Sequence, residues 1–322
     1  FVMVELTGVP YVQIMLAALL PAILFFWAVW VGINAYATRF ELKGIPEDQR
    51  PERRDVFVTS AFFLVPFSML LIAMFALKFT PQYAAAMAIM VGFAALFVDG
   101  RHGVDPRQAI TRIASACVSA GRQIAMIGSI IICASIIIGV LGITGLGVKL
   151  TSVIISGSGG LLWPSLLLTA LACLLLGMEV PTTAAYVICV SVAGPALIEL
   201  GLEPLQAHLF VFWFALLSTI TPPVCGAVFI AAGMIGENWL KVAATAMSLG
   251  IGLYIIPLGM IANPDLIGLS ASPMAALAAF LQVGAGLGAI SYGIIGKGSI
   301  GRKTALIAGG LAVVFIRLVL PS

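Results

Sequence analysis

The sequence predicts an all-α, polytopic membrane protein with a re-entrant hairpin, a discontinuous helix and an inverted repeat. The first observation behind this fold class is composition: 61% of the 322 residues are hydrophobic, 9% are charged, and the mean hydropathy is +1.16, as in polytopic membrane proteins. The second is a series of apolar runs joined by short polar segments. The third is a pair of apolar runs that are interrupted at proline. No polar stretch exceeds roughly 25 residues, which is too short for a soluble domain.

The apolar runs define the elements in chain order. The segment 99–123 holds four arginines and, from Pro106 on, apolar residues at helical spacing, which predicts an amphipathic helix at the membrane interface. The glycine-rich segment 142–160 is predicted to be an outer loop. The predicted spans are 11–37, 56–77, 82–98, 124–141, 240–261, 274–295 and 304–320.

Two short apolar segments, 161–176 and 184–200, flank a tip that contains glycine and proline. Because a full span needs about 20 apolar residues, these segments predict a re-entrant hairpin over 161–200. The next apolar run, 207–236, is long enough to span but is broken at 221–226, which predicts a discontinuous helix. With this topology, thirteen of the sixteen Lys and Arg residues fall on one side, as the positive-inside rule requires of cytoplasmic loops.

A short internal repeat supports the same topology. An aromatic residue, a glycine seven positions later and a second aromatic residue recur at a constant offset, and the predicted topology gives the two copies opposite orientations. The first copy stands at the start of the chain, so we expect the chain to be part of a longer permease in which a similar break precedes Phe1. The matched residues are Phe1, Gly8 and Tyr11 with Phe229, Gly236 and Trp239.

The two interruptions, 177–183 and 218–226, predict a cation site. Proline has no N–H, so Pro181, Pro222 and Pro223 are expected to leave the carbonyls four residues before them without helical partners. Bare carbonyls at membrane depth are costly unless they face protein, water or an ion, and hard cations such as Na⁺ prefer oxygen ligands. The predicted cation ligands are Gly177, Thr182, Thr183, Ser218, Thr219 and Thr221.

The same interruptions predict contacts with an anion. Helices that restart after each break would present their positive N-termini to it, and paired broken segments are typical of the binding sites of secondary transporters. Glu179 in the first tip is a candidate for ion coupling; it can join the cation site, carry a proton or face solvent. The predicted substrate contacts are Thr183, Val224, Cys225 and Gly226.

Other function classes fit the sequence poorly. A membrane-embedded enzyme needs a nucleophile with a base, or clustered carboxylates, and the only histidines, His102 and His208, stand in a charged loop and at a predicted helix start, where His208 is expected to be interfacial. The five cysteines match no metal spacing. We therefore expect no enzymatic activity, no cofactor or metal beyond the coupling cation, and no nucleic-acid partner. A simple anchor subunit would leave two broken helices unexplained.

The segment 177–235, GMEVPTTAAYVICVSVAGPALIELGLEPLQAHLFVFWFALLSTITPPVCGAVFIAAGMI, resembles the large, DctM-like membrane subunit of tripartite ATP-independent periplasmic (TRAP) transporters. The PTTAAY tip and the TPPVCGA break resemble the fused-permease branch that works with TAXI-type binding proteins. The opening FVMVELTGVPYVQIMLAALLPAILFF resembles the segment after the first-repeat break. The resemblance covers most of the chain.

The resemblance implies an elevator-type secondary transporter of the bacterial inner membrane. It implies import of an organic anion, a dicarboxylate or amino acid, driven by a Na⁺ or H⁺ gradient, with a periplasmic binding protein and a small membrane subunit as partners. The alternative is a sodium–dicarboxylate symporter-like carrier, which needs no binding protein. The expected divisions are the end of the first repeat (1–37), scaffold helices with the amphipathic helix (38–123), the second-repeat transport region (124–262) and a C-terminal helix pair (263–322).

Overall fold

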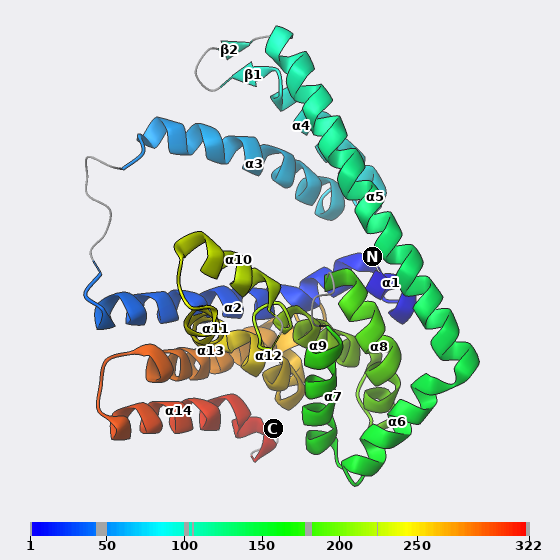
Figure 1. Ribbon diagram of the computed structural model, residues 1–322, viewed down its shortest axis with the longest axis vertical. Coiled ribbons are helices and arrows are strands. Elements are labelled where there is room, and N and C mark those ends of the chain that lie inside the picture. Colours follow the sequence, from blue (N-terminus) through cyan, green and yellow to red (C-terminus); the bar gives the residue numbers. More distant parts are fainter. Residues whose placement is uncertain are drawn as a thin grey trace. The chain divides into compact units, whose positions relative to one another are not determined.

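The computed structural model describes residues 2–42, 50–99, 103–104, 106–177, 182–223 and 225–319. Helices dominate this part of the chain (Figure 1), which confirms the all-α prediction. The short exception is a hairpin of two-residue strands, β1 (Val98–Asp99) and β2 (Gly103–Val104). Segments long and apolar enough to cross a membrane confirm the polytopic character. They are Tyr11–Arg39, Arg53–Phe75, Thr182–Glu199, Trp239–Ala262 and Pro273–Ile295.

The chain divides into two compact units, one formed by residues 1–42 with 130–322 and the other by residues 43–129. In the second unit, helix α3 (Arg53–Phe75) packs against α4 (Pro81–Ala95). Pro81 occupies the first turn of α4, where its missing N–H costs no intrahelical bond. Both helices coincide with predicted spans, although α4 ends before the chain enters the β1–β2 hairpin.

Helix α5 (Pro106–Thr144) differs from the prediction because it is one continuous helix of 39 residues. The sequence predicts an amphipathic helix within 99–123 and a separate span at 124–141. After Pro106 this stretch has no further proline, and its glycines permit a break without imposing one. The amphipathic pattern and the apolar run therefore follow each other along a single helix.

The predicted outer loop at 142–160 is also wrong, since most of it forms helix α6 (Leu146–Gly157). Glycines with positive φ mark its two ends: Gly145 precedes it at φ 64°, while Gly159 and Gly160 follow it at 63° and 73°. Between them lies an apolar run whose Ile154 is buried in the core. Tertiary packing of that run decides in favour of a helix where composition favoured a loop.

Four helices follow around the two predicted breaks, and α7, α8 and α9 pack against one another. The hairpin prediction corresponds to α7 and α8, and the discontinuous helix to α9 and α10. Side chains on nearly every face of α8 and α9 are buried, as expected for helices that are apolar all round and lie inside a larger assembly of helices. The bounds are α7 Leu162–Leu176, α8 Thr182–Glu199, α9 Pro204–Leu217 and α10 Gly226–Ile235.

The predicted span at 240–261 is interrupted at Gly250, which separates α11 (Trp239–Leu249) from α12 (Ile251–Ala262). A Cβ at Gly250 would lie 3.0 Å from the Ala246 carbonyl and 3.0 Å from the Ile220 side chain. Glycine therefore allows the second predicted break, which contains Ile220, to approach this helix closely. The sequence pattern predicts no interruption at this position.

The C-terminal helices pack against helix α2 and against each other. Helix α2 (Tyr11–Arg39) lies against α13 (Pro273–Ile295), where the Trp27 indole N–H donates to the Gly284 carbonyl at 3.0 Å and the Ser291 hydroxyl donates to the Ala28 carbonyl at 2.9 Å. Helix α14 (Ile300–Phe315) packs along α13 (Figure 1). Short 3₁₀ turns, η2 (Pro264–Ile267) and η3 (Ile316–Leu318), precede α13 and follow α14.

The two copies of the predicted repeat have the same local geometry. Helix α1 (Val2–Thr7) ends at Gly8 with φ 69°, and α10 ends at Gly236 with φ 68°. Each glycine donates its N–H to the carbonyl four residues earlier. This left-handed helix end is suited to glycine, which has no Cβ to strain. In both copies a new helix begins at the matched aromatic residue, Tyr11 or Trp239.

Candidate functional site

The two predicted breaks meet at the end of α7. Gly177 closes this helix, with its N–H donating to the Cys173 carbonyl at 2.9 Å. A Cβ at Gly177 would lie 2.8 Å from Oγ and 3.0 Å from Cβ of Ser218, the first residue after α9. The Ser218 side chain is only 1% exposed. Residues that the sequence assigned to separate interruptions thus form one buried contact.

Three hydroxyls of the second break turn back onto the end of α9. Ser218 donates to the Ala215 carbonyl at 2.7 Å, Thr219 to that of Leu216 at 2.8 Å, and Thr221 to that of Leu217 at 2.7 Å. These bonds satisfy carbonyls of the last helical turn. Each hydroxyl donates its proton to a carbonyl at the end of α9. The lone pairs of the hydroxyl oxygens therefore remain available to a cation.

The carbonyl oxygens of Ser218 and Thr219 are also candidate ligands for a cation. Pro222 and Pro223, four residues after each, cannot donate an N–H to them, and among the residues that the structure describes no other backbone N–H does so. In the first break, Glu179 and Pro181 lie outside the described residues. The prediction that Pro181 frees the Gly177 carbonyl therefore remains a prediction.

Thr182 and Thr183 begin α8, the helix that restarts after the first break. The Thr182 side chain is half-buried and that of Thr183 is exposed. In the described part of the chain, neither hydroxyl has a hydrogen-bond partner, so no hydrogen bond links either threonine to Ser218. The structure therefore joins Gly177 to Ser218 directly, while these two threonines share only the packing of α8 against α7 and α9.

The predicted substrate contacts at the second break include Cys225, which is fully buried and packs with Val228 and Ala243. Half-buried Gly226 is the first residue of α10. A ligand at this helix start would therefore meet backbone atoms of residues 225–226 and not the thiol. Val224 lies outside the described residues.

The structure adds Tyr254 of α12, which the sequence does not predict as a site residue. Its hydroxyl lies 2.6 Å from the Thr221 hydroxyl. Since Thr221 donates to the Leu217 carbonyl, Tyr254 acts as the donor to Thr221. Ile220 packs beside Gly250 on the same side of the break. A tyrosine in an apolar run was the available signal, but the sequence alone does not pair it with Thr221.

His208 is predicted to stand at a helix start at the membrane interface; the structure places it in the second turn of α9, where it is 7% exposed, and its depth in the membrane remains a prediction. The helix begins before His208 because Glu203 and Gln206 form a capping box, with the Glu203 N–H donating to the Gln206 side chain, so α9 begins at Pro204. His208 Nδ1 lies 2.7 Å from the hydroxyl of Tyr186 on α8. This buried pair joins the two helices that carry the breaks.

Comparison with protein families gives a match over most of the chain. The model of the family described as "Tripartite ATP-independent periplasmic transporter, DctM component" matches residues 1–275. The match includes both breaks, α12 and the start of α13. No curated protein and no solved structure matches the chain.

Proposed function

We propose, from the premise that this chain belongs to the DctM component family of the tripartite ATP-independent periplasmic (TRAP) transporters, that it imports an organic anion together with a coupling cation. The family is one of transporter components and not of enzymes, and its members work with a periplasmic binding protein and a small membrane subunit. The proposal adds the substrate class, a dicarboxylate or amino acid, and the coupling ion, Na⁺ or H⁺.

The contact between Gly177 and Ser218 is the observation that supports a cation site most strongly. It brings two helix ends together, and helix C-terminal ends with unwound carbonyls are the groups that coordinate Na⁺ in transporters with broken helices. The negative ends of the α7 and α9 dipoles favour a cation there. Oxygen ligands would come from the carbonyls of this contact and from hydroxyls whose protons already point elsewhere. The proposed ligands remain Gly177, Thr182, Thr183, Ser218, Thr219 and Thr221.

The organic anion would bind where the helices restart. The N-termini of α8 and α10 carry unsatisfied N–H groups and the positive ends of the helix dipoles. We assign the carboxylate of the substrate to these N-termini, with Thr183 at the start of α8 and the backbone of residues 224–226 at the start of α10. Cation and anion would then occupy opposite ends of the same two interruptions, so binding of one favours the other electrostatically.

For the partners we propose a TAXI-type periplasmic protein and a small membrane subunit, fused or separate. The support for this branch is the sequence PTTAAY at residues 181–186 and TPPVCGA at 221–227. We place the assembly in a bacterial inner membrane and assign it an elevator mechanism, in which α7–α10 carry the site across. Glu179 is the residue we assign to the choice between Na⁺ and H⁺.

Uptake by proteoliposomes tests this function. The permease, its small subunit and its binding protein are reconstituted, and substrate uptake is measured against external Na⁺ at constant ionic strength. Thr219→Ala should raise the Na⁺ concentration for half-maximal uptake several-fold. The matched control is Thr304→Ala, which removes a hydroxyl that also donates within its own helix, to the Ile300 carbonyl at 2.9 Å. This variant should leave the half-maximal Na⁺ concentration unchanged.

Two results would contradict the proposal. An unchanged Na⁺ dependence in Thr219→Ala, when uptake by the parent protein requires Na⁺, would remove Thr219 from the site. Full uptake of free substrate without the binding protein would instead favour the symporter-like alternative.

A further inference from the structure

Two adjoining cavities lie where the ends of α2 and α11 meet, away from the breaks. One, of about 210 Å³, is lined in part by Arg39, and the other, of about 540 Å³, in part by Lys241. Tyr36, Thr245 and Leu249 line both cavities, which therefore form one continuous depression. We call it the α2–α11 groove, defined by Tyr36, Arg39, Lys241, Thr245 and Leu249.

Each cavity of the groove has one cationic side chain in its lining, Arg39 in the first and Lys241 in the second. Arg39 donates one N–H to the Ile295 carbonyl at 3.2 Å and holds its guanidinium 5.3 Å from the centre of the Phe40 ring. These contacts fix the side chain and leave further guanidinium N–H groups available. In the described part of the chain the Tyr36 hydroxyl has no hydrogen-bond partner, so it can donate to a ligand.

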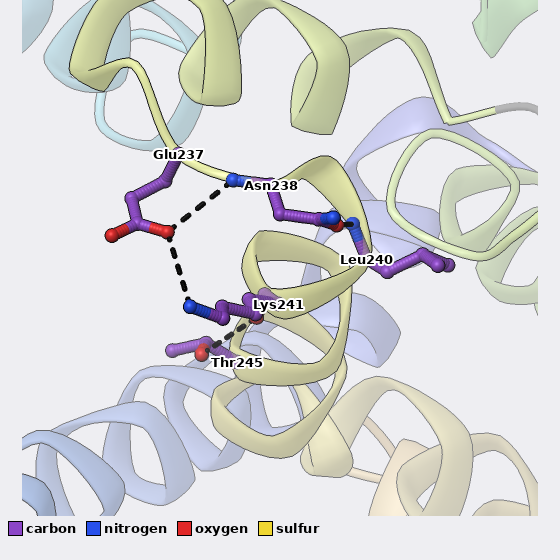
Figure 2. Close-up of polar contacts among 5 residues, drawn as sticks. All are labelled: Glu237, Asn238, Leu240, Lys241 and Thr245. Carbon is purple, nitrogen blue, oxygen red and sulfur yellow. Dashed lines mark hydrogen bonds and ion pairs between the residues drawn. The ribbon is translucent and has the colours of Figure 1, made fainter.

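The second cation has only a weak partner. Figure 2 shows Lys241 beside Glu237, with its ammonium nitrogen 3.5 Å from the carboxylate. The two side chains are 77% and 53% exposed, and exposed pairs of this kind contribute about 0–1 kcal/mol. Glu237 also accepts the Asn238 N–H at 3.3 Å. Lys241 can therefore exchange this carboxylate for a ligand anion at little cost.

The position of these groups along the helices suits the membrane surface. Arg39 is the last residue of α2 and Lys241 lies in the first turn of α11, on the side where the positive-inside rule places the cytoplasm. Tyr36, Phe40 and Trp239 add aromatic rings of the kind that are enriched at this depth. Further along α11, Val242, Ala246 and Leu249 supply apolar walls. The groove thus combines two cationic side chains with apolar walls.

We propose that the α2–α11 groove is a binding site for an anionic phospholipid of the cytoplasmic leaflet. The phosphate lies between Arg39 and Lys241 and accepts the Tyr36 hydroxyl, and an acyl chain lies along Leu249. Basic pockets between helices on the cytoplasmic side bind anionic head groups for these electrostatic reasons. The apolar walls favour a lipid over a free phosphate ion, since only a lipid covers them.

Thermal unfolding of the purified chain in neutral detergent tests the site. Phosphatidylglycerol, phosphatidylcholine and inorganic phosphate are titrated separately. Phosphatidylglycerol should raise the unfolding temperature, while phosphatidylcholine and inorganic phosphate should not. Lys241→Ala and Arg39→Ala should each raise the half-maximal phosphatidylglycerol concentration at least threefold. Glu237→Gln should lower it, because the competing carboxylate is removed.

Lys297→Ala is the matched control. Lys297 has the same charge, is paired loosely with Glu41 at 3.6 Å and lines neither cavity, so the half-maximal concentration should stay unchanged. Native mass spectrometry of retained phosphatidylglycerol gives a second measure if Arg39→Ala alters folding through its bond to Ile295. Equal stabilisation by phosphatidylcholine or by inorganic phosphate would overturn the proposal. An equal effect of Lys241→Ala and Lys297→Ala would overturn it as well.

Discussion

Two close contacts made by glycine, in different parts of the same unit, have opposite consequences. In the α13–α14 pair, a Cβ at Gly286 would lie 2.7 Å from the Gly310 carbonyl, and a Cβ at Gly310 would lie 2.6 Å from the Gly286 carbonyl. Both helices run past this crossing without a break. At Gly177 the glycine instead ends a helix, and its neighbour is the Ser218 hydroxyl at another helix end.

The difference shows what close approach achieves in each place. In the α13–α14 pair, the two glycines have no side chains, so the helix backbones touch. Van der Waals packing of this kind holds membrane helices together. At the Gly177–Ser218 contact, the approach concentrates oxygen atoms and two helix C-termini, which stabilises the protein only if something positive compensates them. The first contact is therefore structural, and the second is the centre of the proposed site.

The largest effect is expected at the structural contact. Gly310→Ala would press its methyl group against the Gly286 backbone, which cannot move away as a flexible side chain can, and overpacking of this kind costs about 1–3 kcal/mol. The neighbouring Gly309→Ala, where no atom lies within 4 Å of the added methyl, should be neutral or slightly stabilising. Unfolding in a denaturing detergent compares the two. Equal stability of both variants would show that the backbones of Gly286 and Gly310 are not in close contact.

A smaller loss of stability is expected for Gly177→Ala. Its methyl group would displace the Ser218 side chain, which can rotate at the expense of its bond to the Ala215 carbonyl. We expect a cost of about 1–2 kcal/mol and, unlike Gly310→Ala, a weaker response to Na⁺. Gly233→Ala in α10, with nothing within 4 Å, is the control. The comparison fails if Gly177→Ala and Gly310→Ala weaken the Na⁺ response equally.

The smallest effect is expected for Tyr254→Phe, which removes the donor to Thr221 at the edge of the second break. A single hydrogen bond contributes about 0.5–1.5 kcal/mol. The half-maximal Na⁺ concentration for uptake should therefore shift modestly, and the substrate concentration for half-maximal uptake should stay constant. Tyr292→Phe in α13 is the control. Identical kinetics of the two variants would mean that Tyr254 does not position the break.

The features that the sequence predicts correctly are those with local causes. Apolar length identifies most helices, and Pro222 and Pro223 mark the end of α9 because they cannot donate the next helical bonds. Glycine gives no such signal, since it permits a break without imposing one. The helix α6, the continuity of α5 and the interruption at Gly250 all depend on tertiary packing, and all three were missed.

The same distinction applies to the candidate site. Ser218 and Thr221 could be selected because hydroxyls stand beside prolines in an apolar run. Tyr254 could not, because its partner Thr221 lies in the break between α9 and α10, and only the fold brings the two hydroxyls within 2.6 Å. His208 lies in the second turn of α9 and not at its start, because the capping box of Glu203 and Gln206 begins the helix earlier.

Direct measurement of Na⁺ binding tests the central claim, that the contact between the two breaks is a cation site. The unfolding temperature of the purified chain is measured in Na⁺ and in choline at equal ionic strength, because a ligand that binds only the folded state stabilises it. We expect Na⁺ to raise the unfolding temperature, Ser218→Ala to abolish most of this shift, and Ser191→Ala, whose hydroxyl donates to the Val187 carbonyl within α8 at 2.7 Å, to retain it. A parent protein that responds equally to Na⁺ and choline, or a Ser218→Ala variant with the full Na⁺ shift, would contradict the account.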